Sequence, residues 1–278
     1  MRLGIFAKTF AGATPLAVLQ AAAGAGYASV QYNMACSGIG PLPAEVTTET
    51  ATAVREASGQ TGVEIAAISA TYNMTHPDQA TRRAGRDSFA AIAAQTHAMG
   101  SRLLTVCSGS MDAQDQWRHH PDNSSAGAWR QMVAEFEALI EIADRHDILI
   151  GVEPELANIV DSARKARTLI DSLGSDRLRI VLDPANLVEI AAPETRRKIV
   201  AEAVDLLADR IVMAHAKDRN ADGTFATAGK GVIDFSHFID ALDGAGFTGD
   251  LITHGLSAEA APWVAEFLRA TLNSRTLA

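Results

Sequence analysis

The chain is poor in cysteine: only Cys36 and Cys107 occur among its 278 residues. Two thiols give no disulfide framework, so we expect a reducing, cytoplasmic environment. No apolar run approaches the roughly 20 residues that a membrane-spanning helix needs. Residues 1–6 are too short an apolar stretch for a signal peptide and predict a strand instead. These absences argue against a secreted disulfide-rich protein and against a membrane-embedded one.

Positive charge is also scarce. The sequence has 24 lysine and arginine residues against 33 aspartate and glutamate residues, which gives a formal net charge of −9. It contains no basic run of the kind that binds nucleic acid or an anionic membrane surface. We therefore expect neither nucleic acid nor a membrane as a partner.

Hydrophobic residues, 47% of the chain, form short strand-like runs that alternate with helical patterns. Eight strands alternating with eight helices predict a parallel sheet, and eight is the number that closes a (β/α)8 barrel. A doubly wound open sheet is the main alternative, but residues 8–15 do not form the Gly-rich phosphate loop typical of it. Because no linker or break in composition occurs, we predict an α/β fold with a single (β/α)8 TIM barrel domain over residues 1–278. The expected strands are Leu3–Phe6, Ser29–Tyr32, Glu64–Ser69, Arg102–Cys107, Ile148–Glu153, Leu178–Asp183, Ile211–His215 and Leu251–His254, and the expected helices are Pro15–Ala25, Ala44–Gln60, Gln79–Met99, Ala126–His146, Asp161–Leu173, Glu194–Leu207, Phe235–Ala245 and Ala260–Leu272.

Four of the expected strands end in a side chain that commonly binds metal ions. These side chains are Glu153, Asp183, His215 and His254, and they follow one another at intervals of about one strand–helix unit. The carboxyl ends of the strands meet at the mouth of a barrel, where active sites lie. Taken singly, each residue has a plainer interpretation as a helix cap, a turn residue or a buried histidine. Four in successive strands favour convergence on one divalent ion.

The alternation of side chains along a strand supports this convergence. If Ile150 and Val152 pack against the helices, Glu153 points into the barrel, and the same parity applies to the other three positions. Two carboxylates and two imidazoles suit manganese, zinc, iron or cobalt better than calcium. Magnesium prefers oxygen ligands. We favour Mn²⁺ as the cofactor, with Zn²⁺, Co²⁺, Fe²⁺ or Mg²⁺ as alternatives.

Four motifs occur in an order that resembles the xylose-isomerase-like TIM barrel superfamily. They are Val-Glu-Pro at 152–154, Leu-Asp-Pro-Ala-Asn at 182–186, His-Ala-Lys-Asp at 215–218 and Gly-Lys-Gly-Val-Ile-Asp-Phe at 229–235. This superfamily includes sugar isomerases and epimerases of the tagatose 3-epimerase and hydroxypyruvate isomerase kind, and proteins similar to endonuclease IV (AP endonuclease family 2 type). The resemblance covers essentially the whole chain, and it implies that Glu153, Asp183 and His215 are metal ligands. The fourth ligand is usually Glu in the epimerases and is His254 here, so the resemblance does not carry over a mechanism with two glutamate bases.

Loops at the expected barrel mouth supply candidates for substrate binding. Trp117 can stack on a sugar face while neighbouring donors bond its hydroxyls, although a tryptophan in such a loop can also just plug the barrel edge. Lys217 can neutralise an enolate or a phosphate, or it can form a salt bridge to Asp183 or Asp218. The predicted substrate-binding residues are Asn73, His76, Trp117, His120, Glu155, Asn186 and Lys217.

These features predict a divalent-metal-dependent sugar isomerase or epimerase acting on a ketose or a related small polyol carbonyl compound. Glu153 and His254 are the predicted catalytic residues. Glu153 would remove a carbon-bound proton to give an enediolate, and His254 would complete the metal shell or return the proton. Because the two bases differ, the pattern favours isomerisation or lyase chemistry over freely reversible epimerisation.

Several alternatives stay open at this point. One is a lyase or hydrolase that uses the same metal site on a keto sugar. Phosphodiester hydrolysis of the endonuclease IV kind would need more metal ligands and a basic groove, which the charge of −9 argues against. A third is a barrel that binds a sugar or metal without turnover. Proteins of this type are often homodimers or homotetramers, which we expect here as well.

Overall fold

In the computed structural model, which describes residues 1–274, eight parallel strands close into a barrel. Their order around the barrel is β1-β10-β7-β6-β5-β4-β3-β2, and each neighbouring pair is parallel. The predicted (β/α)8 TIM barrel is therefore confirmed. The strands are β1 (Arg2–Phe6), β2 (Ser29–Asn33), β3 (Glu64–Ser69), β4 (Leu103–Cys107), β5 (Leu149–Glu153), β6 (Leu178–Leu182), β7 (Ile211–Ala216) and β10 (Asp250–Thr253).

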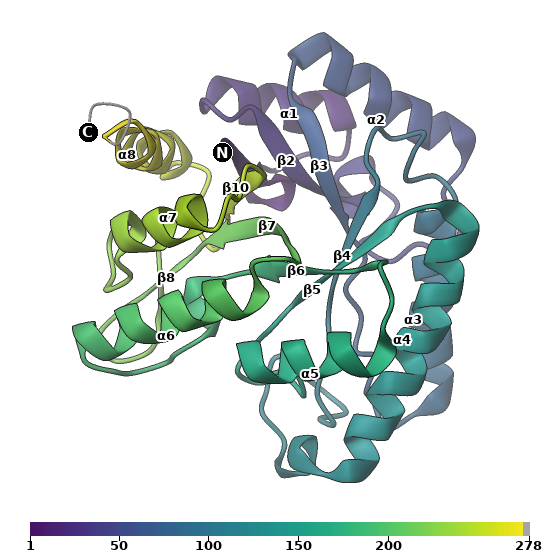
Figure 1. Cartoon of the computed structure of the whole chain (residues 1–278). Helices are drawn as coiled ribbons and strands as arrows, with labels where there is room; N and C mark the ends of the chain where they lie inside the picture. Colours follow the sequence, from purple (N-terminus) through teal and green to yellow (C-terminus); the bar gives the residue numbers. More distant parts are fainter. Residues whose placement is uncertain (275–278) are drawn as a thin grey trace.

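Helices surround this barrel (Figure 1). Helix α2 begins at Thr48 rather than at residue 44, because the Thr47 side chain accepts a hydrogen bond from the Thr50 amide and so caps the helix. Helix α3 ends at Ala93 rather than at residue 99, because the amides of Gln95 and Thr96 bond to carbonyls three residues back instead of four. The helices are α1 (Pro15–Gly24), α2 (Thr48–Thr61), α3 (Gln79–Ala93), α4 (Ala126–His146), α5 (Ala163–Leu173), α6 (Pro193–Leu207), α7 (Phe235–Gly244) and α8 (Ala261–Asn273).

The interior of the barrel is packed with side chains. Alternate strand residues point into it and form a small apolar cluster, while Ile150 and Val152 belong to the larger core between the strands and the helices. A Cβ atom on Gly4 would lie 2.4 Å from Ile252 Cδ1, so this layer has no room for a larger residue at position 4. The predicted strand parity is thus confirmed. The inward-facing cluster consists of Ala67, Leu103, Val181, Met213 and Ile252.

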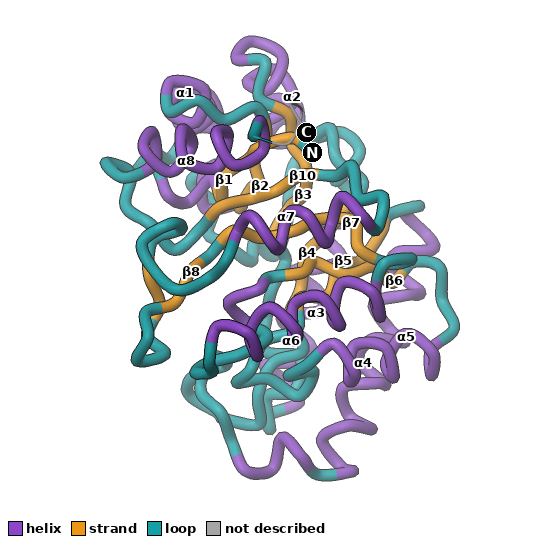
Figure 2. The backbone as a smooth tube through the Cα atoms, turned by 60° about the vertical axis from the view of Figure 1, so that its left-hand side comes forward, coloured by secondary structure: helices purple, strands orange, loops and turns teal. Residues whose placement is uncertain are grey.

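A small hairpin stands outside the barrel, in the segment between β7 and α7. It pairs β8 (Asp218–Arg219) with β9 (Phe225–Ala226) in antiparallel fashion. Figure 2 shows β8 apart from the ring of barrel strands. The buried Asp218 carboxylate accepts hydrogen bonds of 2.9–3.0 Å from the amides of Gly229, Gly231 and Ile233, which fixes the segment after the hairpin.

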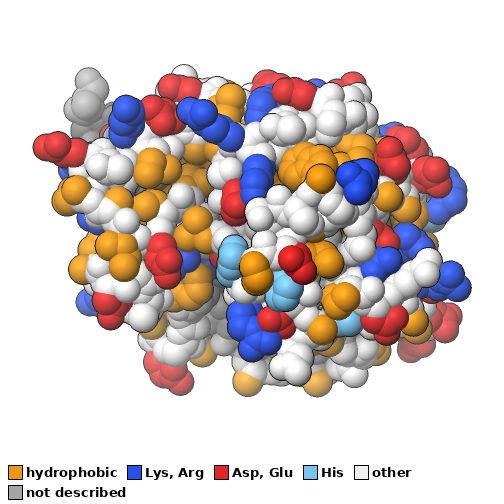
Figure 3. All heavy atoms as spheres, turned by 90° about the horizontal axis from the view of Figure 1, so that it is seen from below, with side chains coloured by type: hydrophobic (Ala, Val, Ile, Leu, Met, Phe, Trp, Pro, Cys, Tyr) orange, Lys and Arg blue, Asp and Glu red, His pale blue; other side chains and the backbone are white. Residues whose placement is uncertain are grey.

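The surface seen in Figure 3 carries acidic and basic side chains that are interspersed, with hydrophobic side chains between them. Over residues 1–274, no helix combines the length and the apolar character needed to cross a bilayer.

Candidate metal centre and substrate cavity

The four predicted metal-binding side chains converge at the mouth of the barrel. Each offers one nitrogen or oxygen atom, and these four atoms lie within 4.8 Å of one another. Glu153 ends β5, Asp183 directly follows β6, His215 lies in β7, and His254 directly follows β10. Because β5, β6, β7 and β10 are neighbours in the barrel, parallel strands place their ends side by side. The geometric expectation is met, while the roles of these residues as ligands stay predictions.

Each carboxylate of this cluster faces an imidazole ring. Nδ1 of His215 lies 3.1 Å from Glu153 Oε1, and Nε2 of His254 lies 3.1 Å from Asp183 Oδ2. The two rings meet edge to face with centroids 4.5 Å apart. Asp183 uses its other oxygen, Oδ1, to accept a 2.9 Å hydrogen bond from the Ala185 amide. One oxygen of Asp183 is therefore held by the backbone and the other is directed at the cluster.

The electrostatics of the cluster favour the protonation states that metal ligands require. Burial raises the pKa of Asp183, but Lys217 and His254 outweigh it and hold the value at about 2. Burial likewise opposes ionisation of Glu153, yet the neighbouring His215 leaves its pKa below the usual range. Burial lowers the pKa of His254. At neutral pH both acids are thus charged and the His254 ring is neutral, the forms in which these residues bind metals.

Two amide side chains, those of Gln31 and Asn186, form hydrogen bonds that orient members of the cluster. Gln31 Oε1 lies 2.7 Å from Nε2 of His215, and Gln31 Nε2 donates to Thr105 Oγ1 at 2.8 Å. Asn186 Nδ2 donates a 2.8 Å hydrogen bond to Glu153 Oε1. Because an amide oxygen only accepts, Nε2 of His215 carries a hydrogen and the ring is fixed in orientation.

This donor set fits a divalent cation. Both ring nitrogens of His215 face oxygen acceptors, so either a proton or a metal ion is needed between Nδ1 and Glu153. Two carboxylates in one cluster, Asp183 buried and Glu153 half-buried, also require compensating positive charge. A mixture of imidazole nitrogens and carboxylate oxygens suits manganese, iron, cobalt or zinc.

A cavity of about 300 Å³ opens over this cluster. Of the seven predicted substrate-binding residues, Trp117, Glu155, Asn186 and Lys217 line it. Further lining residues were not among the predicted set, and several of them are the last residue of a strand, as Glu153 is. The predicted end of each strand would therefore have been enough to identify these residues as candidates for the cavity lining. The additional residues are Phe6, Gln31, Ser69, Thr71, Cys107 and Phe225.

Lys217 and Glu155 give the cavity a pair of buried ionisable groups. Lys217 Nζ lies 3.8 Å from Asp183 Oδ2 and 3.9 Å from the centre of the Phe225 ring, so it contacts both the metal cluster and the hairpin. Burial raises the pKa of Glu155 to about 7, a rise that Lys217 partly opposes and Glu153 reinforces. A carboxyl group with this pKa can both donate and accept a proton near neutral pH.

Asn73 and His76 do not reach this cavity. They line a neighbouring one of about 520 Å³, which shares Thr71 and Trp117 with the first. Their polar atoms are engaged with the loop after β4: Asn73 Nδ2 donates to the Asp112 carbonyl at 3.1 Å, and His76 Nε2 lies 2.9 Å from the Ala113 carbonyl.

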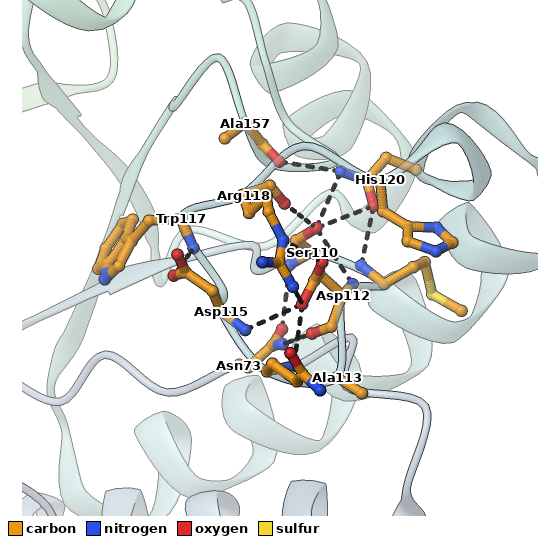
Figure 4. Close-up of polar contacts among 12 residues, drawn as sticks. Asn73, Ser110, Asp112, Ala113, Asp115, Trp117, Arg118, His120 and Ala157 are labelled. Carbon is orange, nitrogen blue, oxygen red and sulfur yellow. Dashed lines mark hydrogen bonds and ion pairs between the residues drawn. The ribbon is translucent and has the colours of Figure 1, made fainter.

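His120 lines neither cavity. Its Nδ1 accepts a 3.2 Å hydrogen bond from the Asp122 amide and so caps the short 3₁₀ helix Pro121–Ser124. Arg118, the positively charged residue next to Trp117, is paired within the loop. It forms two hydrogen bonds of 2.6 and 2.8 Å to Asp112. Figure 4 shows the Trp117 ring on one side of this hydrogen-bonded loop and His120 on the other. The structure thus separates these two predicted residues.

Both the sequence and the fold of this chain are similar to those of known proteins. The family model described as xylose isomerase-like TIM barrel matches residues 19–271. No curated protein matches the sequence. Among solved structures, apo 3-keto-D-glucoside 4-epimerase from E. coli shares 15% identity with a TM-score of 0.77 and covers 97% of this chain and 99% of its own. L-ribulose 3-epimerase shares 18% identity with a TM-score of 0.76, covering 98% and 95%, and a D-tagatose 3-epimerase-like protein shares 16% with a TM-score of 0.77, covering 100% of both chains. The TM-scores show a common fold, and at such low sequence identities the similarity shows the fold alone.

Proposed function

Because the chain belongs to the xylose isomerase-like TIM barrel family, we propose that it is a divalent-metal-dependent isomerase or epimerase of a ketose or a related small polyol carbonyl compound. The cluster of Glu153, Asp183, His215 and His254 beneath a cavity of about 300 Å³ is the observation that carries this proposal. The solved structures with similar folds include 3-keto-D-glucoside 4-epimerase, L-ribulose 3-epimerase and D-psicose 3-epimerase, which are sugar epimerases.

The four clustered side chains would hold the ion, and we favour manganese. When bound, a divalent cation supplies Lewis acidity toward a carbonyl oxygen and a neighbouring hydroxyl of the sugar. Glu153, ionised at neutral pH, accepts the proton from the carbon next to the carbonyl, which leaves an enediolate. His254, a neutral imidazole in the same cluster, is the second candidate to carry a proton back to the substrate.

Other cavity residues have roles that follow from their charge and position. The Lys217 ammonium would stabilise negative charge that develops on a substrate oxygen. Glu155, with a pKa of about 7, would move a proton between substrate oxygens. Trp117 and Phe225 offer aromatic faces to the apolar side of a sugar ring, and Asn186 orients Glu153 as well as lining the cavity.

His254 favours a second candidate within the same chemistry. An imidazole and a carboxylate differ in charge and in basicity, so the two sides of an enediolate meet different proton carriers. This asymmetry favours isomerisation, or a lyase or hydrolase reaction of a keto sugar, over freely reversible epimerisation. A barrel that binds sugar or metal without turnover is the non-catalytic alternative. A cytoplasmic location, a homodimer or homotetramer, a single domain over 1–278, and the lack of nucleic-acid and membrane partners stay predictions.

Solvent exchange tests the proposal. Protein loaded with Mn²⁺ should exchange carbon-bound hydrogen of at least one ketose or 3-keto sugar with deuterium from D₂O, as measured by NMR. Glu153→Gln should lower the exchange rate by about 10²–10⁴-fold, because it removes the base while keeping a similar shape. Glu137→Gln, at an exposed position of α4, is the matched control and should exchange at the normal rate.

Two results would contradict the proposal: no exchange with any sugar of the panel, or full exchange by Glu153→Gln. Sugar binding without exchange would instead support the non-catalytic alternative.

A further inference from the structure

A second cavity adjoins the one above the metal cluster. It has a volume of about 520 Å³ and lies between the segment after β3, the first turns of α3 and the loop after β4. Thr71 and Trp117 line both cavities, so the two lie side by side at the barrel mouth. The function proposed above, which concerns one small sugar, makes no use of this second cavity.

Hydrogen bonds between two loops hold one wall of the second cavity in place. Asn73 Oδ1 accepts a 3.0 Å hydrogen bond from the Ser110 amide, and its Nδ2 donates to the Asp112 carbonyl, which ties the two loops together (Figure 4). Gly109 adopts φ +74°, and a Cβ there would lie 2.2 Å from Asn73 Oδ1, so only glycine allows this approach. A preformed wall lowers the entropic cost of binding a ligand against it.

The lining of the second cavity matches a neutral, hydroxylated ligand. Trp117 is 51% exposed, which is unusual for the largest apolar side chain, and its ring borders both cavities. Gln116 Oε1 is buried, and it has no hydrogen-bond partner among the described residues. A buried carbonyl oxygen without a donor is costly, and a ligand hydroxyl would satisfy it.

The charges of the lining disfavour an anionic ligand. The lining includes Asp115 and no lysine or arginine. Arg82 and Arg86, on the adjoining helix, pair with the buried Glu135. A phosphate group would therefore meet no free cation there. An aromatic face combined with amide and hydroxyl groups is the arrangement that binds sugar rings.

We propose that the second cavity is a subsite for a further sugar unit, joined by a glycosidic bond to the sugar that reacts above the metal cluster. The substrate class is then a keto sugar within a glycoside or disaccharide rather than a free monosaccharide. Trp117 lies where the two rings would join, and Gln116 Oε1 would accept a hydrogen bond from a hydroxyl of the second ring. This inference rests on the proposed function for the first cavity.

Ala84→Trp tests the subsite. Ala84 is exposed on α3 and lines only the second cavity, so a tryptophan there would obstruct it. Deuterium exchange is measured with Mn²⁺-loaded protein on 3-keto-glucose, on a 3-keto disaccharide, on a ketohexose and on its 4-O- and 6-O-glucosyl derivatives. The wild type should give a higher kcat/KM for a glycosylated sugar than for its free counterpart. Ala84→Trp should lower that ratio about tenfold, and Ala80→Trp, exposed on the same helix outside both cavities, should preserve it.

Binding measurements separate the failure of the subsite from the failure of the proposed function. If no sugar exchanges deuterium, the proposed chemistry is wrong, and calorimetric titration of the same sugars then decides on the subsite. Tighter binding of a glycosylated sugar, lost in Ala84→Trp and retained in Ala80→Trp, supports it. Equal kinetics and equal binding of free and glycosylated sugars, or an Ala84→Trp variant with the wild-type preference, would overturn it.

Discussion

The orientation of His215 depends on a residue outside the predicted ligand set. Gln31 accepts the hydrogen of Nε2, and it is itself held by Thr105. A register shift in the pairing of β2 with β3 occurs between Val30 and Gln31. Such irregularities redirect side chains near functional sites. The Gln31 amide is thus part of what makes His215 available to a metal through Nδ1.

Gln31→Ala should weaken metal binding. Loss of the acceptor frees the His215 ring, and removal of such an orienting partner typically costs about 10–100-fold in metal affinity. Calorimetric titration with Mn²⁺ measures this directly. Gln79→Ala, at an exposed position of α3, is the control and should bind as the wild type does. Unchanged affinity in Gln31→Ala would show that the ring needs no orienting partner.

Both thiols are buried, and burial raises the pKa of each. Burial raises the pKa of Cys36 from 9.0 to about 11. Because only the thiolate reacts, modification of Cys36 by a disulfide reagent at pH 8 should be at least about 100-fold slower in the folded protein than in the unfolded chain. Its raised pKa also means that the folded state loses stability as pH rises from about 9 to 11, because the unfolded chain releases its proton first.

The absorbance of the thiol that the disulfide reagent releases follows this reaction. In the Cys107→Ser variant only Cys36 can react. Fast modification under native conditions would show that Cys36 is accessible, contrary to its 2% exposure.

Residues such as Glu153 and His254 were predictable because each ends a clear apolar run. The placement of His120 was not, because Asp122 and the 3₁₀ helix determine it locally. Phe225 gave no signal either, since its position depends on how the hairpin lies over the mouth.

At the scale of elements, strand parity was the most informative pattern. Alternation predicted which residues fill the barrel interior, and Val181, Met213 and Ile252 are found there. The β8–β9 hairpin was missed because strands of two residues have no measurable periodicity. Helix ends were missed by a few residues where a cap such as Thr47, rather than the apolar pattern, decides the start.

Two glycine substitutions should change stability in opposite directions. A Cβ at Gly4 of β1 would lie 2.4 Å from both Ile252 Cδ1 and Ser29 Oγ, so Gly4→Ala should lower the free energy of unfolding by about 1–3 kcal/mol. Gly59 lies inside α2 with no atom within 4 Å of an added Cβ, so Gly59→Ala should raise it by about 0.5–1 kcal/mol. Urea unfolding followed by circular dichroism measures both. Equal stability of the two variants would contradict this account of the barrel layer.

At the scale of the whole molecule, the regular alternation of strands and helices made the fold predictable. A parallel barrel repeats one unit, so local patterns add up to one topology. The position of two cavities side by side, with Trp117 lining both, could not be predicted. It depends on how two long loops pack on each other.

A metal bound by this cluster would link β5, β6, β7 and β10, which form one continuous part of the barrel wall. Mn²⁺ at about 100 times its dissociation constant should stabilise the fold by about 2.7 kcal/mol and raise Tm by about 5–10 °C relative to protein in EDTA. Differential scanning fluorimetry measures the shift. Asp183→Asn should abolish it, whereas an equal shift in that variant would place the ion elsewhere.

One wall of the substrate cavity, Phe225, belongs to the hairpin and not to the barrel. The barrel strands cannot be rearranged without loss of the closed sheet, but residues 220–224 join the two short strands and are mostly exposed. Changes in the length or composition of this connection would reshape the cavity without disturbing the four clustered side chains. If the proposed function holds, directed evolution of new sugar specificities therefore has a natural starting segment, one that leaves Glu153, Asp183, His215 and His254 unchanged.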